Sequence, residues 1–138
     1  MNERDSRIRP VEVELFFDDR PYELGETVEI TVSLNPQGVY EIRAGRVDLV
    51  CEESWTETAT IQRELRARNV HCSTLVTPDT RNQSIPGKHR VRLSIRRRPP
   101  IHFGKGLSEY AVTWKLVASV HTAHMSEIAA ERAMNVTL

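Results

Sequence analysis

The chain has 138 residues, the size of one ordinary domain, and its 39% hydrophobic and 28% charged residues exclude a disordered or coiled-coil chain. Nineteen basic and nineteen acidic side chains leave no net charge, which argues against a nucleic-acid-binding protein held by net charge. No apolar run approaches the roughly 18 residues that span a bilayer, and the start MNERDSRIRP is too polar for a signal peptide. We therefore expect a cytoplasmic protein whose two cysteines, Cys51 and Cys72, are free thiols.

The zero net charge hides an asymmetry along the chain. Residues 1–60 carry 14 acidic and 6 basic side chains, a difference of −8, whereas residues 61–138 carry 5 acidic and 13 basic, a difference of +8. Such halves either attract one another inside a single fold or present opposite patches to partners.

Strict alternation of apolar and polar residues is the dominant pattern. In residues 26–34, for example, every second side chain is Val, Ile or Leu, which is typical of a strand with one buried and one wet face. Turn residues separate these runs, and no helical periodicity lies between them. The pattern predicts an all-β domain, an antiparallel two-sheet sandwich over residues 8–138 after a tail of residues 1–7. The alternating runs are residues 11–17, 26–34, 46–52, 90–96, 110–120 and 134–138.

Residues 54–77 admit two interpretations. Ile61 and Leu65 are four residues apart, which suits a short helix that begins near Thr60. Threonine-rich and β-branched stretches flank this segment, however, and they favour a long hairpin. We expect the hairpin.

The order of the predicted elements resembles the N-terminal domain of the arrestin family, including its bacterial sporulation-control relatives and its retromer-subunit branch. The resemblance implies an immunoglobulin-like sandwich that binds other proteins, sometimes membranes, and catalyses nothing. Two features depart from the family: its members usually carry a second sandwich, whereas we expect a single one in these 138 residues, and Glu12 and Glu14 stand where receptor-type arrestins hold basic residues. The runs that carry the resemblance are VEVELFF, RPYELGETVEITVSL, GRVDLVCEES, SIPGKHRVRLSI, RRRPPIHFGKG, WKLVASV and ERAMNVTL.

The clearest candidate site is the cluster Arg96, Arg97 and Arg98. A row of guanidinium groups can hold phosphate or carboxylate groups in bidentate fashion. Cross-strand pairing is the alternative and is at least as well supported, because opposite charges on neighbouring strands stabilise a sheet. In an immunoglobulin-like sheet the exposed faces bear Glu12 and Glu14, then Glu29, then Arg90 and Arg92. Arg97 and Arg98 lie beyond the predicted strand, so they are the better candidates for contacting a partner.

The sequence contains no clear metal-binding, cofactor-binding or catalytic motif. On a strand, His121 and His124 point to opposite sides, and His71 beside Cys72 is an incomplete ligand set, so a structural role is favoured for all four. No nucleophile-elbow, phosphate-loop or zinc-protease motif occurs. His102 and Ser108 are a conceivable base and nucleophile, but no neighbouring residue in the sequence orients them. We expect no enzyme and no cofactor.

Three binding functions follow, in order of preference. The first is a non-catalytic adaptor that engages a protein through loops or by strand addition at an open sheet edge, where a second copy of the chain is one partner. The second is a carbohydrate-binding or small-ligand-binding module that uses Trp55 or a loop pocket. Trp114, by contrast, belongs to the apolar stripe and is expected in the core. The third is binding of an anionic membrane surface through Arg96–Arg98.

Overall fold

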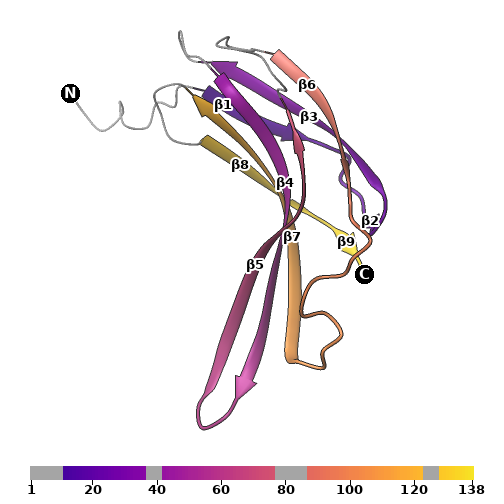
Figure 1. Cartoon of the computed structure of the whole chain (residues 1–138), viewed down its shortest axis with the longest axis vertical. Helices are drawn as coiled ribbons and strands as arrows, with labels where there is room; N and C mark the ends of the chain where they lie inside the picture. The colour runs from indigo at the N-terminus through magenta and orange to yellow at the C-terminus, as the bar shows by residue number, and fades with distance from the viewer. Residues whose placement is uncertain (1–10, 37–41, 77–86, 123–127) are drawn as a thin grey trace, which may run out of the picture.

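The computed structural model describes residues 11–36, 42–76, 87–122 and 128–138, and these ranges hold nine strands and no helix (Figure 1). Alternating β-branched and polar residues explain why the backbone is extended almost throughout. No helix long and apolar enough to cross a membrane occurs in the described ranges. The strands are β1 (Val11–Phe16), β2 (Tyr22–Glu23), β3 (Thr27–Pro36), β4 (Ile42–Thr58), β5 (Gln62–Leu75), β6 (Gly87–Ser94), β7 (Ser108–Thr122), β8 (Ile128–Met134) and β9 (Val136–Thr137).

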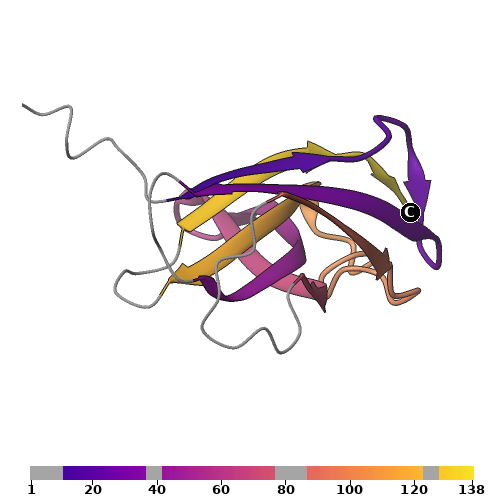
Figure 2. The ribbon, with the colours of Figure 1, turned by 90° about the horizontal axis from the view of Figure 1, so that it is seen from above.

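The strands form two layers. A three-stranded antiparallel sheet has the order β1-β3-β6, and a four-stranded antiparallel sheet has the order β5-β4-β7-β8. Figure 2 shows β1 and β3 lying as a separate layer over the sheet that contains β4, β5 and β7. A short parallel pair of β2 and β9 adds to this arrangement. The predicted all-β two-sheet sandwich is therefore confirmed.

The two sheets share one interior. Val28 of β3, Leu49 of β4 and Leu116 of β7 are fully buried, and they belong to one hydrophobic cluster that also contains Trp114. Val91 of β6 is partly buried and packs against this cluster. The residues that alternation assigned to the inner face are thus the residues that meet between the layers. Cys51 and Cys72 are buried within the same cluster as free thiols, as expected.

Residues 54–76 of the segment 54–77 form a hairpin, so the helical alternative is wrong. β5 pairs with β4 from Gln62↔Thr58 to Leu75↔Arg46, which gives the backbone groups of this segment their partners in a sheet. Ile61, which the helical interpretation places beside Leu65, lies at the turn with 77% of its surface exposed. The hairpin extends, together with the start of β7, beyond the three-stranded sheet (Figure 1).

The C-terminal run 134–138 differs from its prediction as a single strand. β8 ends at Met134, and Asn135 belongs to no strand. The short β9 then pairs with β2 instead of continuing β8. The reason is a long-range contact, because the carbonyl of Asn135 accepts a hydrogen bond from the Tyr22 amide of β2 at 2.9 Å. The predicted boundary between a tail of residues 1–7 and the domain lies outside the described residues.

We predict that Leu116→Ala lowers the free energy of unfolding by about 2–5 kcal/mol, because the substitution removes a fully buried side chain and leaves a cavity between the sheets. Urea denaturation followed by tryptophan fluorescence measures this loss. Leu75→Ala is the matched control, since Leu75 is 63% exposed, and it should cost less than about 0.5 kcal/mol. Equal losses at the two positions would contradict a shared interior.

Candidate protein-binding groove

The cluster Arg96–Arg98 begins the loop of residues 95–107, which joins β6 to β7. Two backbone hydrogen bonds fix the start of this 95–107 loop: the Ile95 amide donates to the Glu26 carbonyl and the Gly25 amide donates to the Ile95 carbonyl, both at 2.8 Å. Gly25 has a φ of 94°, and a Cβ there would lie 2.9 Å from Nε of Arg97. The side chain of Arg97 therefore lies over the turn between β2 and β3, which needs glycine.

A second anchor joins the loop to the long hairpin. Nε2–H of His71 donates to the carbonyl oxygen of Arg96 at 2.9 Å. His71 is the extra residue of a β-bulge, because Val70 pairs with Val50 while Cys72 already pairs with Leu49. Such a bulge redirects a side chain, and here the imidazole lies edge-on to the ring of Trp114 with centroids 5.1 Å apart.

The third anchor is a buried carboxylate. Glu53 of β4 has a fully buried side chain that accepts three hydrogen bonds. The Tyr110 hydroxyl donates to Oε2 at 2.7 Å, the His102 amide donates to the same oxygen at 2.9 Å, and Nδ1 of His102 lies 3.2 Å from Oε1. Because these donors come from β7 and from the loop, Glu53 ties three segments together.

These contacts decide the ionisation of the cluster. Burial raises the pKa of Glu53, but the hydrogen bonds from Tyr110 and His102 outweigh it, so the pKa lies below its ordinary value of 4.5 and the group is a carboxylate. Burial, and then the hydrogen bond to this carboxylate, raise the pKa of Tyr110, which stays a donor. Burial also raises the pKa of the Cys51 thiol to about 12, so Cys51 is not a reactive nucleophile.

With the loop held in this way, a groove of about 380 Å³ lies between it and the inner side of the hairpin. Its apolar rim consists of Val70, Ile101 and Phe103, which are 57%, 58% and 43% exposed. Arg98 supplies a positive charge and Asn69 supplies an amide. The groove is lined by Cys51, Glu53, Asn69, Val70, His71, Arg98, Pro99, Pro100, Ile101 and Phe103.

The three predicted partner-binding arginines are exposed, but the structure separates their surroundings. Only Arg98 lines the groove, while Arg97 lies over Gly25 and Arg96 contributes its backbone carbonyl to His71. Within the described residues, none of the three forms an ion pair with a carboxylate. A partner-binding role for Arg96–Arg98 stays a prediction.

The predicted alternative of cross-strand pairing is found elsewhere, on β3 and β6. Glu29 lies directly opposite Arg92, and Oε1 of Glu29 is 3.3 Å from a terminal guanidinium nitrogen of Arg92. Both side chains are more than 70% exposed, so the pair contributes little to stability.

Glu53 was not recognised from the sequence, although a signal was present. It continues the alternating series of inward residues Val47, Leu49 and Cys51, and a carboxylate in such a series must find donors. The view that no residue orients His102 is therefore wrong, since Glu53 does so. No hydrogen bond joins His102 to Ser108 among the described residues, however, so the pair of base and nucleophile is not assembled.

The other candidate residues, the proposed metal ligands and the two tryptophans, give less support for a binding site. No group of three or more potential metal ligands occurs in the part of the chain that the structure describes, and His124 lies outside it. Trp114 is buried, as expected. Trp55 is half-buried, and the ring of His102 lies 4.4 Å from its ring at an angle of 30°, so one face of the indole is already covered.

Comparisons with known proteins bear on the fold. No family model and no curated protein sequence matches the chain. Among solved structures, the sporulation control protein Spo0M from Bacillus subtilis superimposes with a TM-score of 0.70 at 17% identity, over 95% of this chain and 51% of that one. The chain has the β-sandwich fold of Spo0M, which agrees with the predicted arrestin-like sandwich, and it spans about half the length of that protein.

Two further structures are less similar. A conjugative transposon lipoprotein from Bacteroides eggerthii has a TM-score of 0.42 at 12% identity, over 91% of this chain and 97% of that one. Murine CRIg has a TM-score of 0.31 at 8% identity, over 92% of this chain and 99% of that one. Neither likeness is close enough to support an inference, and the retromer-subunit branch stays a prediction.

We predict that Glu53→Gln lowers the free energy of unfolding at neutral pH by about 1–3 kcal/mol, because the amide leaves a buried donor without its acceptor. The pKa of Glu53 is lowered by folding, so its stabilising effect is present above pH 4.5 and is lost as the pH falls through the folded-state value. The difference in free energy of unfolding between the wild type and the variant should therefore become smaller in acid. Urea unfolding over a pH series measures it.

Glu57→Gln is the control for this experiment. Glu57 lies on the same strand but its side chain is 46% exposed, and its pair with Arg63 is equally open to water. The control should shift stability by less than about 0.5 kcal/mol. A difference for Glu53→Gln that does not change with pH would show that the carboxylate is not the anchor.

Proposed function

We propose that this chain is a non-catalytic, arrestin-like adaptor or regulatory module that binds an extended segment of a partner protein along β5. The observation that carries the proposal is the groove, which combines the charge of Arg98 with the exposed apolar side chains of Val70, Ile101 and Phe103. Exposed apolar groups around a polar anchor are the usual composition of a protein-binding site. The regulatory role agrees with the likeness to Spo0M, and the cytoplasmic location stays a prediction.

The open edge of β5 supplies the backbone part of this site. Within the described residues β5 pairs only with β4, so one side of a 14-residue strand has free amide and carbonyl groups. An extended peptide satisfies such groups by adding a strand, while its alternate side chains enter neighbouring pockets. Val70 and Asn69 belong both to β5 and to the groove, so a peptide on this edge reaches the groove directly.

The charges along β5 select the partner. Arg63, Arg66 and Arg68 are exposed on this strand, and such basic residues on an edge discourage indiscriminate pairing. An acidic partner gains from the same residues. We infer a segment that alternates acidic and apolar side chains, with a carboxylate that reaches Arg98 and apolar side chains that cover Ile101 and Phe103.

The other two binding functions have less support. A sugar needs an open aromatic face, and His102 covers one face of Trp55. An anionic surface needs several charges on one plane, whereas Arg97 lies over Gly25 and only Arg98 reaches the groove. A saturable fluorescence change on titration with a panel of glycans would favour the carbohydrate function over the adaptor.

We predict that an array of extended peptides incubated with the full chain selects alternating acidic and apolar sequences. Arg98→Ala should weaken the best of these peptides by about tenfold, because it removes the charged hydrogen bonds to the carboxylate. Fluorescence anisotropy of the labelled peptide gives the two dissociation constants.

Lys105→Ala is the matched control, since Lys105 is an exposed cation of the same loop that does not line the groove. It should change the affinity less than about twofold. Equal losses for Arg98→Ala and Lys105→Ala would show that binding follows general charge rather than the groove, and selection of neutral peptides would overturn the proposed partner chemistry.

A further inference from the structure

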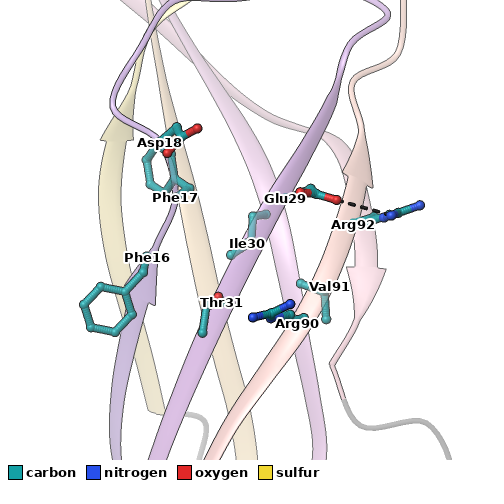
Figure 3. Close-up of a pocket in the computed structure, with 9 residues that line it drawn as sticks. All are labelled: Phe16, Phe17, Asp18, Glu29, Ile30, Thr31, Arg90, Val91 and Arg92. Carbon is teal, nitrogen blue, oxygen red and sulfur yellow. Dashed lines mark ion pairs between the residues drawn. The ribbon is translucent and has the colours of Figure 1, made fainter.

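On the outer face of the three-stranded sheet, acidic side chains lie at β1 and basic side chains lie on β6. We call these two sets of residues the acidic column and the basic column. β1 presents Glu14, and Asp18, which follows β1, lines a surface hollow. At the other edge of the sheet, β6 presents Lys88, Arg90 and Arg92. β3 lies between them and presents mainly hydroxyl groups. Figure 3 shows the middle of this face, with Phe16, Thr31 and Arg90 side by side and the pair of Glu29 and Arg92 next to them.

The register fixes the rows of this face. Glu14 pairs with Ser33, which pairs with Lys88, and the next row is Phe16, Thr31 and Arg90. All the terminal members of these rows are exposed, including Phe16, of which 45% is exposed. The hollow that the second row helps to line has a volume of about 770 Å³.

The acidic and basic columns cannot neutralise each other within one chain. Neighbouring strands lie about 4.8 Å apart, so β1 and β6 are separated by about 10 Å across β3. Accordingly, Glu14, Lys88 and Arg90 form no ion pair with any described residue. Within the described residues, Glu14 on one side of β3 and Lys88 and Arg90 on the other side are thus unpaired, while Glu29 of β3 pairs with Arg92.

We propose that this face binds the same face of a second copy of the chain, in a two-fold symmetric pair whose axis runs along β3. Rotation about this axis turns the second copy over, so that its β1 lies above β6 of the first copy and its β6 lies above β1. The acidic side chains at β1 of each copy then lie opposite the basic side chains of β6 of the other copy, so the dimer contains two equivalent contacts of this kind. Rotation about an axis perpendicular to the strands would instead place like charges together.

The rows are self-complementary in this arrangement. Glu14 faces Lys88 of the second copy, and Phe16 faces Arg90 of the second copy, where a guanidinium over an aromatic ring is favourable. Asp18 faces Arg92 of the second copy. The two Glu29 side chains face each other across the axis, and each is paired with Arg92 of its own copy. Each contact recurs by symmetry, as in an isologous interface. The twist of the two sheets limits the match to these middle rows.

The test is sedimentation velocity of the full chain over a range of concentrations. We expect the wild type to dimerise reversibly near micromolar concentration and to dissociate as salt is added. Glu14→Lys alone, or Lys88→Glu alone, places like charges opposite each other at two symmetric positions. Each single variant should weaken the dimer by about tenfold or more while keeping the wild-type circular dichroism and melting temperature.

Complementation makes the test specific for this geometry. An equimolar mixture of the Glu14→Lys and Lys88→Glu chains restores opposite charges at both positions of a mixed dimer, and the double variant restores them in a homodimer. Both should regain wild-type association. Lys105→Glu in the exposed 95–107 loop is the control and should leave association unchanged.

Three results would overturn the proposal. The first is a wild-type chain that stays monomeric up to about 100 micromolar. The second is a dimer that the single charge reversals do not weaken, which would place the interface elsewhere, for example at the edge of β5. The third is single variants that fail to complement each other, which would exclude the two-fold axis along β3.

Discussion

The carboxylate of Glu53 is the interaction on which the candidate groove depends. Its hydrogen bonds fix the middle of the 95–107 loop against β4, where the rim residues Ile101 and Phe103 remain exposed and contribute little burial. A buried carboxylate costs free energy unless its lone pairs are satisfied, and here three donors satisfy them. The donors come from the loop and from β7, so the ionised group positions both. The cluster thus holds the loop and β7 in one arrangement around β4.

The period of two along each strand governs both faces of the three-stranded sheet. Val28, Ile30 and Val32 of β3 enter the core because their neighbours Glu29 and Thr31 point the other way. The inner face needs only apolar volume, so it fixes the fold. The outer face is free to vary, and here it is sorted by charge from strand to strand. The opposite charge balances of the two halves of the sequence therefore appear partly as opposite edges of one sheet.

How far the sequence predicts the structure differs between core and site. Alternation alone identifies the inward residues of β3, β4 and β7, because burial in a sheet is a local consequence of the pleat. The hairpin of β4 and β5 follows from β-branched residues in the same way. The groove does not follow, because Glu53 and His102 are 49 residues apart and meet only after the sheets have packed. Likewise, the bulge at His71 follows from a register that no local pattern reveals.

The two proposed surfaces belong to different sheets, and this has a consequence for binding. The groove lies by β5 of the four-stranded sheet, whereas the charged face belongs to β1, β3 and β6. A symmetric pair formed through the charged face therefore leaves both grooves open. Two grooves held in one rigid pair bind a partner with two acidic segments more tightly than either groove alone, since the second contact is intramolecular. Salt screens the charges that hold the pair together, whereas the groove is partly apolar. Raising the ionic strength therefore lowers the number of linked grooves more than it lowers the affinity of a single groove.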